Sequence, residues 1–230
     1  MLNLLAAAAF FLAIHSLVSG TRLRDALIAR IGQGPYMGLF ELASFAGLGW
    51  LGFAYAHARS EPSNVAYWSV GDASRQVQIG LQLIAFLLIV PGIMTQNPTS
   101  VRQEGALERP DVVKGMVRVS RHPFLWGVAV WALGHLIVNG DRAGIVLFGT
   151  MLMLALFGPA SIDAKRRRAL GPAYDAFTAQ TSSIPFAAIL AGRQKLSLSE
   201  IGAARILAAV AVWAALAWAH PFLFGVRALP

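Results

Sequence analysis

The chain of 230 residues contains no cysteine. This absence excludes disulfide bonds, cysteine-ligated iron–sulfur clusters, thiolate-ligated haem and covalent haem attachment through a CxxCH motif. A bound metal or haem iron would therefore take its protein ligands from histidine, carboxylate or methionine side chains.

Charged residues are also scarce. They make up 13% of the chain, against 57% hydrophobic residues, and the mean hydropathy is +0.60. A soluble core of this size does not absorb so much apolar surface, and a hydrocarbon layer about 30 Å thick calls for helices of about 20 apolar residues. We predict an all-α fold, a polytopic integral membrane bundle of about six transmembrane helices. The predicted spans are Leu2 to Val18, Met37 to Ala58, Val77 to Gln96, Pro123 to Asn139, Gly144 to Pro159, the shortest, and Ile206 to Phe224. No internal repeat or shift in composition divides the chain, so residues 1–230 are predicted to form a single domain.

The net charge of +8 comes from lysine and arginine residues that gather in particular loops. With the N-terminus outside, nearly all of the 19 cations lie on one side, the exceptions being Arg59, Arg75, Arg142 and Arg227. The positive-inside rule then predicts a bacterial inner-membrane protein with both termini in the periplasm. Topology explains the basic excess, so we expect membrane lipid and not nucleic acid as the partner. The first segment is expected to be a retained span and not a cleaved signal, because its cations follow it.

Two histidines, His15 and His135, lie within predicted spans, where a polar ring is costly without a partner or cofactor. Trp131 and His135 share one face of the fourth predicted helix. Gly127 and Gly134 thin the adjoining surface, so we expect a flat cofactor to fit there. The alternative is that each histidine simply hydrogen-bonds to a neighbouring helix or to the headgroup layer.

Arg121 and His122 precede Pro123, which suits the first turn of a helix. Their side chains and the free amides of that turn would hold a carboxylate, a phosphate or a lipid headgroup. A simple positive anchor at the membrane surface is the alternative.

A second charged segment, residues 163–168, follows the fifth predicted span. Asp163 is expected to pair with Arg167 at the i to i+4 spacing. The remaining cations, Arg166 among them, are expected to contact lipid phosphates or the propionates of a bound haem. The alternative is an anchoring belt without a ligand.

Several of these motifs together resemble the NnrU family of bacterial membrane proteins over nearly the whole chain. They are His15-Ser16, the segment from Arg121 to Asp141, Asp163-Ala164-Lys165-Arg166, Leu170-Gly171-Pro172-Ala173-Tyr174 and Thr181-Ser182-Ser183-Ile184-Pro185-Phe186. The resemblance implies an association with nitrite and nitric oxide metabolism, that is denitrification, and with a respiratory partner protein. It also implies kinship with the haem-containing zeta-carotene isomerase of plastids.

Carried over to this sequence, that kinship implies haem b ligated by His15 and His135. Trp131 would wall the macrocycle, and Arg121 or the cations of residues 165–168 would bind its propionates. Ala132 stands where the isomerase has a cysteine, so a ligand switch through that thiol is not available here. The predicted spans place the two histidines roughly 12 Å apart in depth. They would share one iron only if the macrocycle lay rather flat in the membrane.

A more distant resemblance leaves other functions open. The segment from Arg121 to Gly127, together with Gly171 and Tyr174, is similar to membrane methyltransferases of the isoprenylcysteine carboxyl methyltransferase type. It implies S-adenosylmethionine bound near Arg121, His122, Asp163 and Tyr174, although Ile162 replaces one acid of the pair found in those enzymes. A third alternative is a non-catalytic assembly subunit of a respiratory reductase. Whether the protein is an enzyme stays open on the sequence alone.

Overall fold

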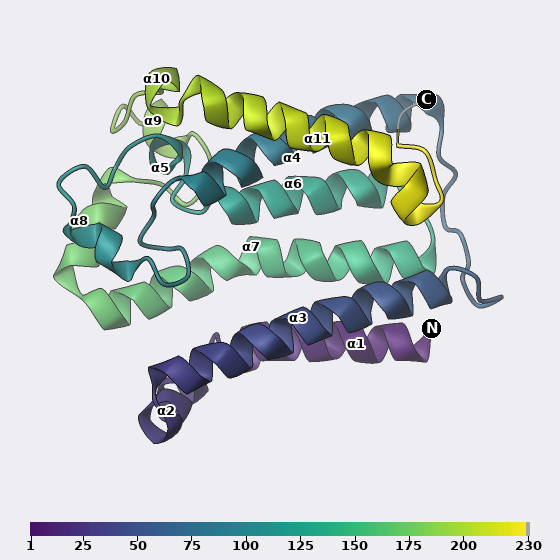
Figure 1. Cartoon of the computed structure of the whole chain (residues 1–230), viewed down its shortest axis with the longest axis horizontal. Coiled ribbons are helices and arrows are strands. Elements are labelled where there is room, and N and C mark those ends of the chain that lie inside the picture. The colour runs from purple at the N-terminus through teal and green to yellow at the C-terminus, as the bar shows by residue number, and fades with distance from the viewer. Residues whose placement is uncertain (229–230) are drawn as a thin grey trace.

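The computed structural model describes residues 1–228 as an arrangement of helices (Figure 1). Its longer elements are α1 (Leu2–Ala13) with the π-helical turn η1 (Ile14–Val18), α2 (Arg22–Ile31), α3 (Gln33–Ala58), α4 (Asp72–Met94), α6 (Pro123–Val138), α7 (Arg142–Leu170) and α11 (Ala203–Phe224). Short helices connect them, namely η2 (Glu104–Glu108), α5 (Met116–Val119), α8 (Pro172–Gln180), α9 (Ala187–Leu190) and α10 (Leu198–Ile201). Within residues 1–228 there is no β-strand, only an isolated bridge between Ala66 and Asp141.

Four helices, α3, α4, α7 and α11, are long and apolar enough to cross a membrane. The first predicted span meets the same test only together with α2, from which it is bent by 79°. Helix α6 is apolar but only 16 residues long. The prediction of a polytopic helical membrane bundle is confirmed.

The fifth predicted span differs most from its expected length. It was expected to end at Pro159, but α7 runs for 29 residues, to Leu170, and is the longest helix of the described chain. Pro159 is buried inside the helix. A proline inside a helix removes one hydrogen bond, and packing around its ring lets the helix continue. Asp163 and the cations that follow it are therefore placed on a helix and not in a loop.

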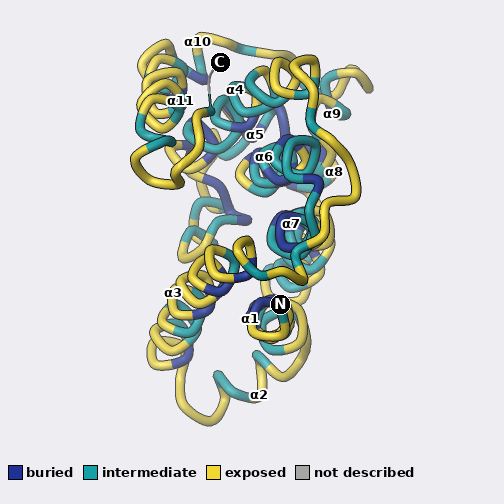
Figure 2. The backbone as a smooth tube through the Cα atoms, turned by 90° about the vertical axis from the view of Figure 1, so that its right-hand side faces the viewer, coloured by how far each residue is buried: buried dark blue, intermediate teal, exposed yellow. Residues whose placement is uncertain are grey.

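Helix α7 lies between two groups of helices (Figure 1). It packs against α1 and α3 on one side and against α6 on the other, and α6 in turn packs against α4, which carries α11. Buried residues follow the inner faces of these helices, while α2 and α11 are largely exposed (Figure 2). Small side chains such as Ala7, Ala54 and Ala143 fill the contact of α1, α3 and α7.

Helix α4 packs directly against the glycines of α6. The expectation that a flat cofactor fits on this surface is therefore wrong. A Cβ added at Gly127 would lie 2.5 Å from Ile89 Cγ1 and 2.9 Å from the Ala85 carbonyl oxygen. At Gly134 it would lie 2.6 Å from Gln82 Nε2. Glycine permits two helices to approach closely, and here the approaching body is a helix and not a macrocycle.

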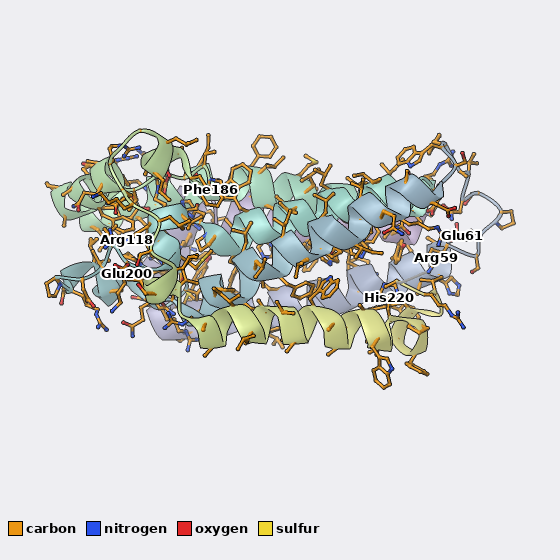
Figure 3. The ribbon with its side chains drawn as sticks, turned by 90° about the horizontal axis from the view of Figure 1, so that it is seen from above. Arg59, Glu61, Arg118, Phe186, Glu200 and His220 are labelled. Carbon is orange, nitrogen blue, oxygen red and sulfur yellow. The ribbon has the colours of Figure 1, made fainter. Side chains whose placement is uncertain are left out.

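One end of the bundle, called here the basic end, carries α2, α5, α8, α9 and α10 (Figure 1). Arg118 and Glu200 lie at this end, whereas Arg59, Glu61 and His220 lie at the opposite end (Figure 3). The start of α1 and the end of α11 both lie at that opposite end, so the two ends of the described chain share one side. Which side of the membrane that is remains a prediction.

Candidate functional site

The basic end contains a buried polar network centred on Asp163. Its Oδ2 accepts from Arg121 Nη2 at 2.6 Å, and its Oδ1 lies 2.8 Å from His122 Nε2 and accepts from the Tyr174 hydroxyl at 2.7 Å. Asp163 is 8% exposed, His122 3% and Tyr174 0%. Three elements meet here: the start of α6, the last turns of α7 and the helix α8.

This network corrects one predicted partner. Asp163 does not pair with Arg167, which instead donates to Asp175 at 2.7 Å on the surface. Arg121 is preferred because it reaches both carboxylate oxygens from a largely buried position, with Nε donating to Oδ1 at 3.1 Å and Nη2 to Oδ2, and two parallel hydrogen bonds of this kind are strong. A pair on one helix face offers a single exposed contact.

The charge state of the network follows from its burial. Burial lowers the pKa of His122, and the nearby Asp163 only partly offsets this effect. Burial and the hydrogen bond to Asp163 both raise the pKa of Tyr174. At neutral pH the network therefore holds a guanidinium and a carboxylate with a neutral imidazole and a neutral phenol. Arg121, His122 and Asp163 are brought together as a group, but they bind one another, and their role in binding a cofactor remains a prediction.

The lowered pKa of His122 predicts a loss of stability in mild acid. The unfolded chain takes up the proton near the ordinary value of 6.5, before the folded chain does, so the free energy of unfolding should fall as the pH drops below about 6.5. Denaturant unfolding in detergent between pH 8 and pH 5.5 measures this dependence, and His122→Asn should make it shallower. Equal pH dependence in the variant and the parent would contradict the prediction.

Arg166 binds the loop that follows α4. It forms an ion pair with Glu104 and donates to the Ser100 carbonyl oxygen at 2.8 Å, which fastens the loop after α4 to α7. Its Nε atom is buried and has no hydrogen-bond partner among the described residues. Its predicted contact with a haem propionate is untested.

His135 projects from α6 into an aromatic setting. Its ring lies 4.6 Å from that of Trp131 and is stacked on Phe148 of α7, with centroids 4.7 Å apart. Nδ1 lies 2.9 Å from the Trp131 carbonyl oxygen. A carbonyl only accepts, so Nδ1 carries the proton and Nε2 keeps its lone pair. Within residues 1–228, Nε2 makes no hydrogen bond.

His15 has the same arrangement on a different helix. It lies in the π-helical turn η1, with Nδ1 2.8 Å from the Phe11 carbonyl oxygen, so its Nε2 is also the unprotonated atom. The rings of Phe11 and Phe40 flank it at 4.4 and 5.3 Å. π-Helical turns are rare in proteins as a whole, but those that occur are often found at functional sites. Hydropathy carries no signal for such a turn, so the sequence did not predict it.

The two histidines lie at different levels along α7. His135 stacks on Phe148 near the start of the helix, whereas Ser19, one turn after His15, accepts a hydrogen bond from Lys165 near its end. At 1.5 Å per residue the histidines are on the order of 10 to 20 Å apart along the bundle. Imidazole nitrogens bind metals at about 2 Å. Each ring has the tautomer that a metal ligand needs, but in this arrangement the two rings do not fit opposite faces of one iron.

Two glutamines near His135, Gln78 and Gln82, were not predicted from the sequence to belong to the site. Gln82 Nε2 donates to the Trp131 carbonyl oxygen at 3.2 Å and to Gln78 Oε1 at 3.0 Å, and Gln82 Oε1 is buried without a donor among the described residues. The signal was present, since the two glutamines stand four residues apart in the otherwise apolar helix α4. Gln82 therefore binds the same carbonyl that fixes the tautomer of His135, and Gln78 accepts a hydrogen bond from Gln82.

The chain is similar to two curated proteins and to one family model. It is 28% identical over 116 residues to the chloroplastic 15-cis-zeta-carotene isomerase of Zea mays, and 32% identical over 114 residues to that of Arabidopsis thaliana. These matches cover 49% and 48% of this chain but only 30% and 31% of the relatives, so the chain matches under a third of their length. No solved structure is significantly similar. A family model described as NnrU protein matches residues 3–228, and the chain therefore belongs to the NnrU family.

Proposed function

We propose that this protein is an isomerase-like membrane protein that acts on an apolar polyene and uses haem b bound at an intramembrane histidine. The observation that carries the proposal is the shared state of His15 and His135. Both rings have Nδ1 fixed on a backbone carbonyl and Nε2 free, and both are surrounded by aromatic side chains. The similarity to two carotene isomerases supports a polyene as the substrate class.

Each of the two rings has the chemistry needed to ligate a haem iron on its own. A fixed Nδ1–H group sets the ring orientation and raises the basicity of the other nitrogen. Haem b would supply a redox-active iron at such a ring. The chain's own residues hold the imidazole, and Trp131 and Phe148 exclude water around His135. Because the spacing does not suit one iron between the two rings, we propose a single histidine ligand for the arrangement described here.

The visible spectrum tests the cofactor. Protein purified after haem supplementation is expected to show a Soret band, which His135→Ala or His15→Ala should abolish while the other variant retains it. His57→Ala is a matched control, because His57 lies at the end of α3, stacked on Phe53. No Soret band in either redox state would overturn haem binding. A band lost in both variants would overturn the single-ligand form.

The isomerase activity is tested separately. A 15-cis polyene in liposomes with the haem-loaded protein should convert to its trans isomer, as followed by chromatography. Haem without isomerisation would leave electron transfer or gas sensing as the role of the iron, in keeping with the association of the family with nitrogen-oxide metabolism. A co-purifying respiratory protein with neither haem nor isomerisation would favour the assembly-subunit alternative.

Methyl transfer is less well supported. The residues that would bind S-adenosylmethionine are Arg121, His122, Asp163 and Tyr174. The last three are buried, Arg121 is only 12% exposed, and all four bind one another. We also propose the bacterial inner membrane as the location, with the basic end in the cytoplasm, because the cations of this end follow the positive-inside rule.

A further inference from the structure

Lys165 occupies an unusual position at the basic end, between α7 and the turn that follows His15. Its ammonium donates to Ser19 Oγ at 3.1 Å, and within residues 1–228 it forms no ion pair. Arg24, Arg166 and Arg168 are close enough to repel its charge, and the attraction from Asp25 is weaker. Burying an ammonium group without a paired carboxylate is costly, so a bound anion would stabilise Lys165.

The carboxylates near this group of cations, Asp25 and Glu104, are already paired with arginines. Asp25 lies 3.3 Å from Arg24 and 4.0 Å from Arg168, and Glu104 is paired with Arg166. Four cations thus share two carboxylates. The surplus positive charge is concentrated where the helices leave the membrane, which is the level of lipid phosphates.

Tyr36, at the start of α3, supplies an independent observation. It is 4% exposed, and its hydroxyl lies beside Ser19 and Arg24 but makes no hydrogen bond of ordinary geometry with any of the described residues. The Arg24 guanidinium lies 5.7 Å from the centre of its ring. Buried hydroxyls are almost always paired, so an unpaired one next to Ser19, the residue that Lys165 contacts, marks a place for an acceptor oxygen.

Aromatic rings continue from this point into the membrane. Tyr36 stacks on Phe40 with centroids 6.2 Å apart, and Phe40 contacts the ring of His15 at 5.3 Å. A ligand whose anionic group lies at Lys165 would therefore meet an apolar wall along its remaining length. That is the arrangement of a lipid and not of a free anion.

From these contacts we infer that Lys165, Ser19, Tyr36 and Arg24 bind the phosphate of an anionic membrane lipid. Lys165 and Arg24 supply charge, and the Tyr36 hydroxyl donates to a phosphate oxygen. The inference does not depend on the proposed function, because neither Nε2 atom proposed to bind haem takes part in it.

Tyr36→Phe tests the inference because it removes only the hydroxyl and keeps the ring that Arg24 contacts. The variant should unfold in lipid-free detergent at the same midpoint as the parent, because its hydroxyl has no partner to lose. Its affinity for phosphatidylglycerol, measured by native mass spectrometry and by the rise in melting temperature on lipid addition, should fall about tenfold. Lys165→Gln should lower the affinity at least as much.

Arg167→Gln is the matched control, because it removes one cation from the same helix turn but from a surface pair with Asp175. It should keep the affinity within about twofold, in line with the small contribution of exposed pairs. Phosphatidylcholine and inorganic phosphate are the comparison ligands, and neither should raise the melting temperature. Equal binding of both lipids, full competition by inorganic phosphate, or an unchanged affinity in Tyr36→Phe would each overturn the inference.

Discussion

Replacing Asp163 with asparagine is expected to lower the free energy of unfolding by about 3–5 kcal/mol. The substitution keeps the shape of the side chain but removes the charge that Arg121 faces from a position only 12% exposed. It also replaces one of the two acceptor oxygens with a donor, next to the hydrogen bonds from His122 and Tyr174. An uncompensated buried guanidinium is the main cost.

Asp175→Asn is the matched control for this experiment. Asp175 also pairs with an arginine of α7, but both side chains of that pair are about half exposed. Exposed pairs contribute about 0–1 kcal/mol, so the control should unfold close to the parent. Denaturant unfolding in detergent, followed by tryptophan fluorescence, measures both variants. Equal effects of the two substitutions would mean that the Asp163 network is not buried in the folded protein.

Gly127→Ala is expected to destabilise the protein by about 1–3 kcal/mol, although the change adds a single methyl group. The new Cβ would lie 2.9 Å from the Ala85 carbonyl oxygen and 3.0 Å from the Ile89 amide nitrogen. Both are backbone atoms of α4, so the clash is relieved only by moving one helix from the other. The same unfolding assay measures the loss.

Gly149→Ala, on the neighbouring helix α7, is not expected to lower the stability of the protein. No heavy atom lies within 4 Å of the Cβ that would be added there. Alanine is favoured over glycine in a helix by up to about 1 kcal/mol, so this variant should be unchanged or more stable. If both glycine variants changed stability in the same direction, close packing of α4 and α6 would be contradicted.

The positions of the helices could be predicted because apolar runs are a direct consequence of the membrane. The length of α7 could not, since Pro159 and the charged residues after it are ordinary signs of a helix end. They are overridden by the burial of the proline and by the partners that α6 and α8 supply to Asp163. Local sequence contains the residues of such a contact but not the geometry that joins them.

The sequence predicted which residues belong to the site better than it predicted which of them contact one another. Arg121, His122 and Asp163 were singled out by their types, and they do meet, but the identity of each partner depends on which helices are neighbours. Gly127 and Gly134 likewise signal close approach without saying what approaches. The roles of His15 and His135 depend on the tautomer of each ring, which is set by a carbonyl one turn earlier.

Helix α7 has a mechanical consequence, because the two groups of helices that carry the histidines both pack against it. The separation of His15 and His135 is set by the distance along a single rod. One residue inserted into α7 between Phe148 and Lys165 would turn one group against the other by about 100° and shift it by about 1.5 Å.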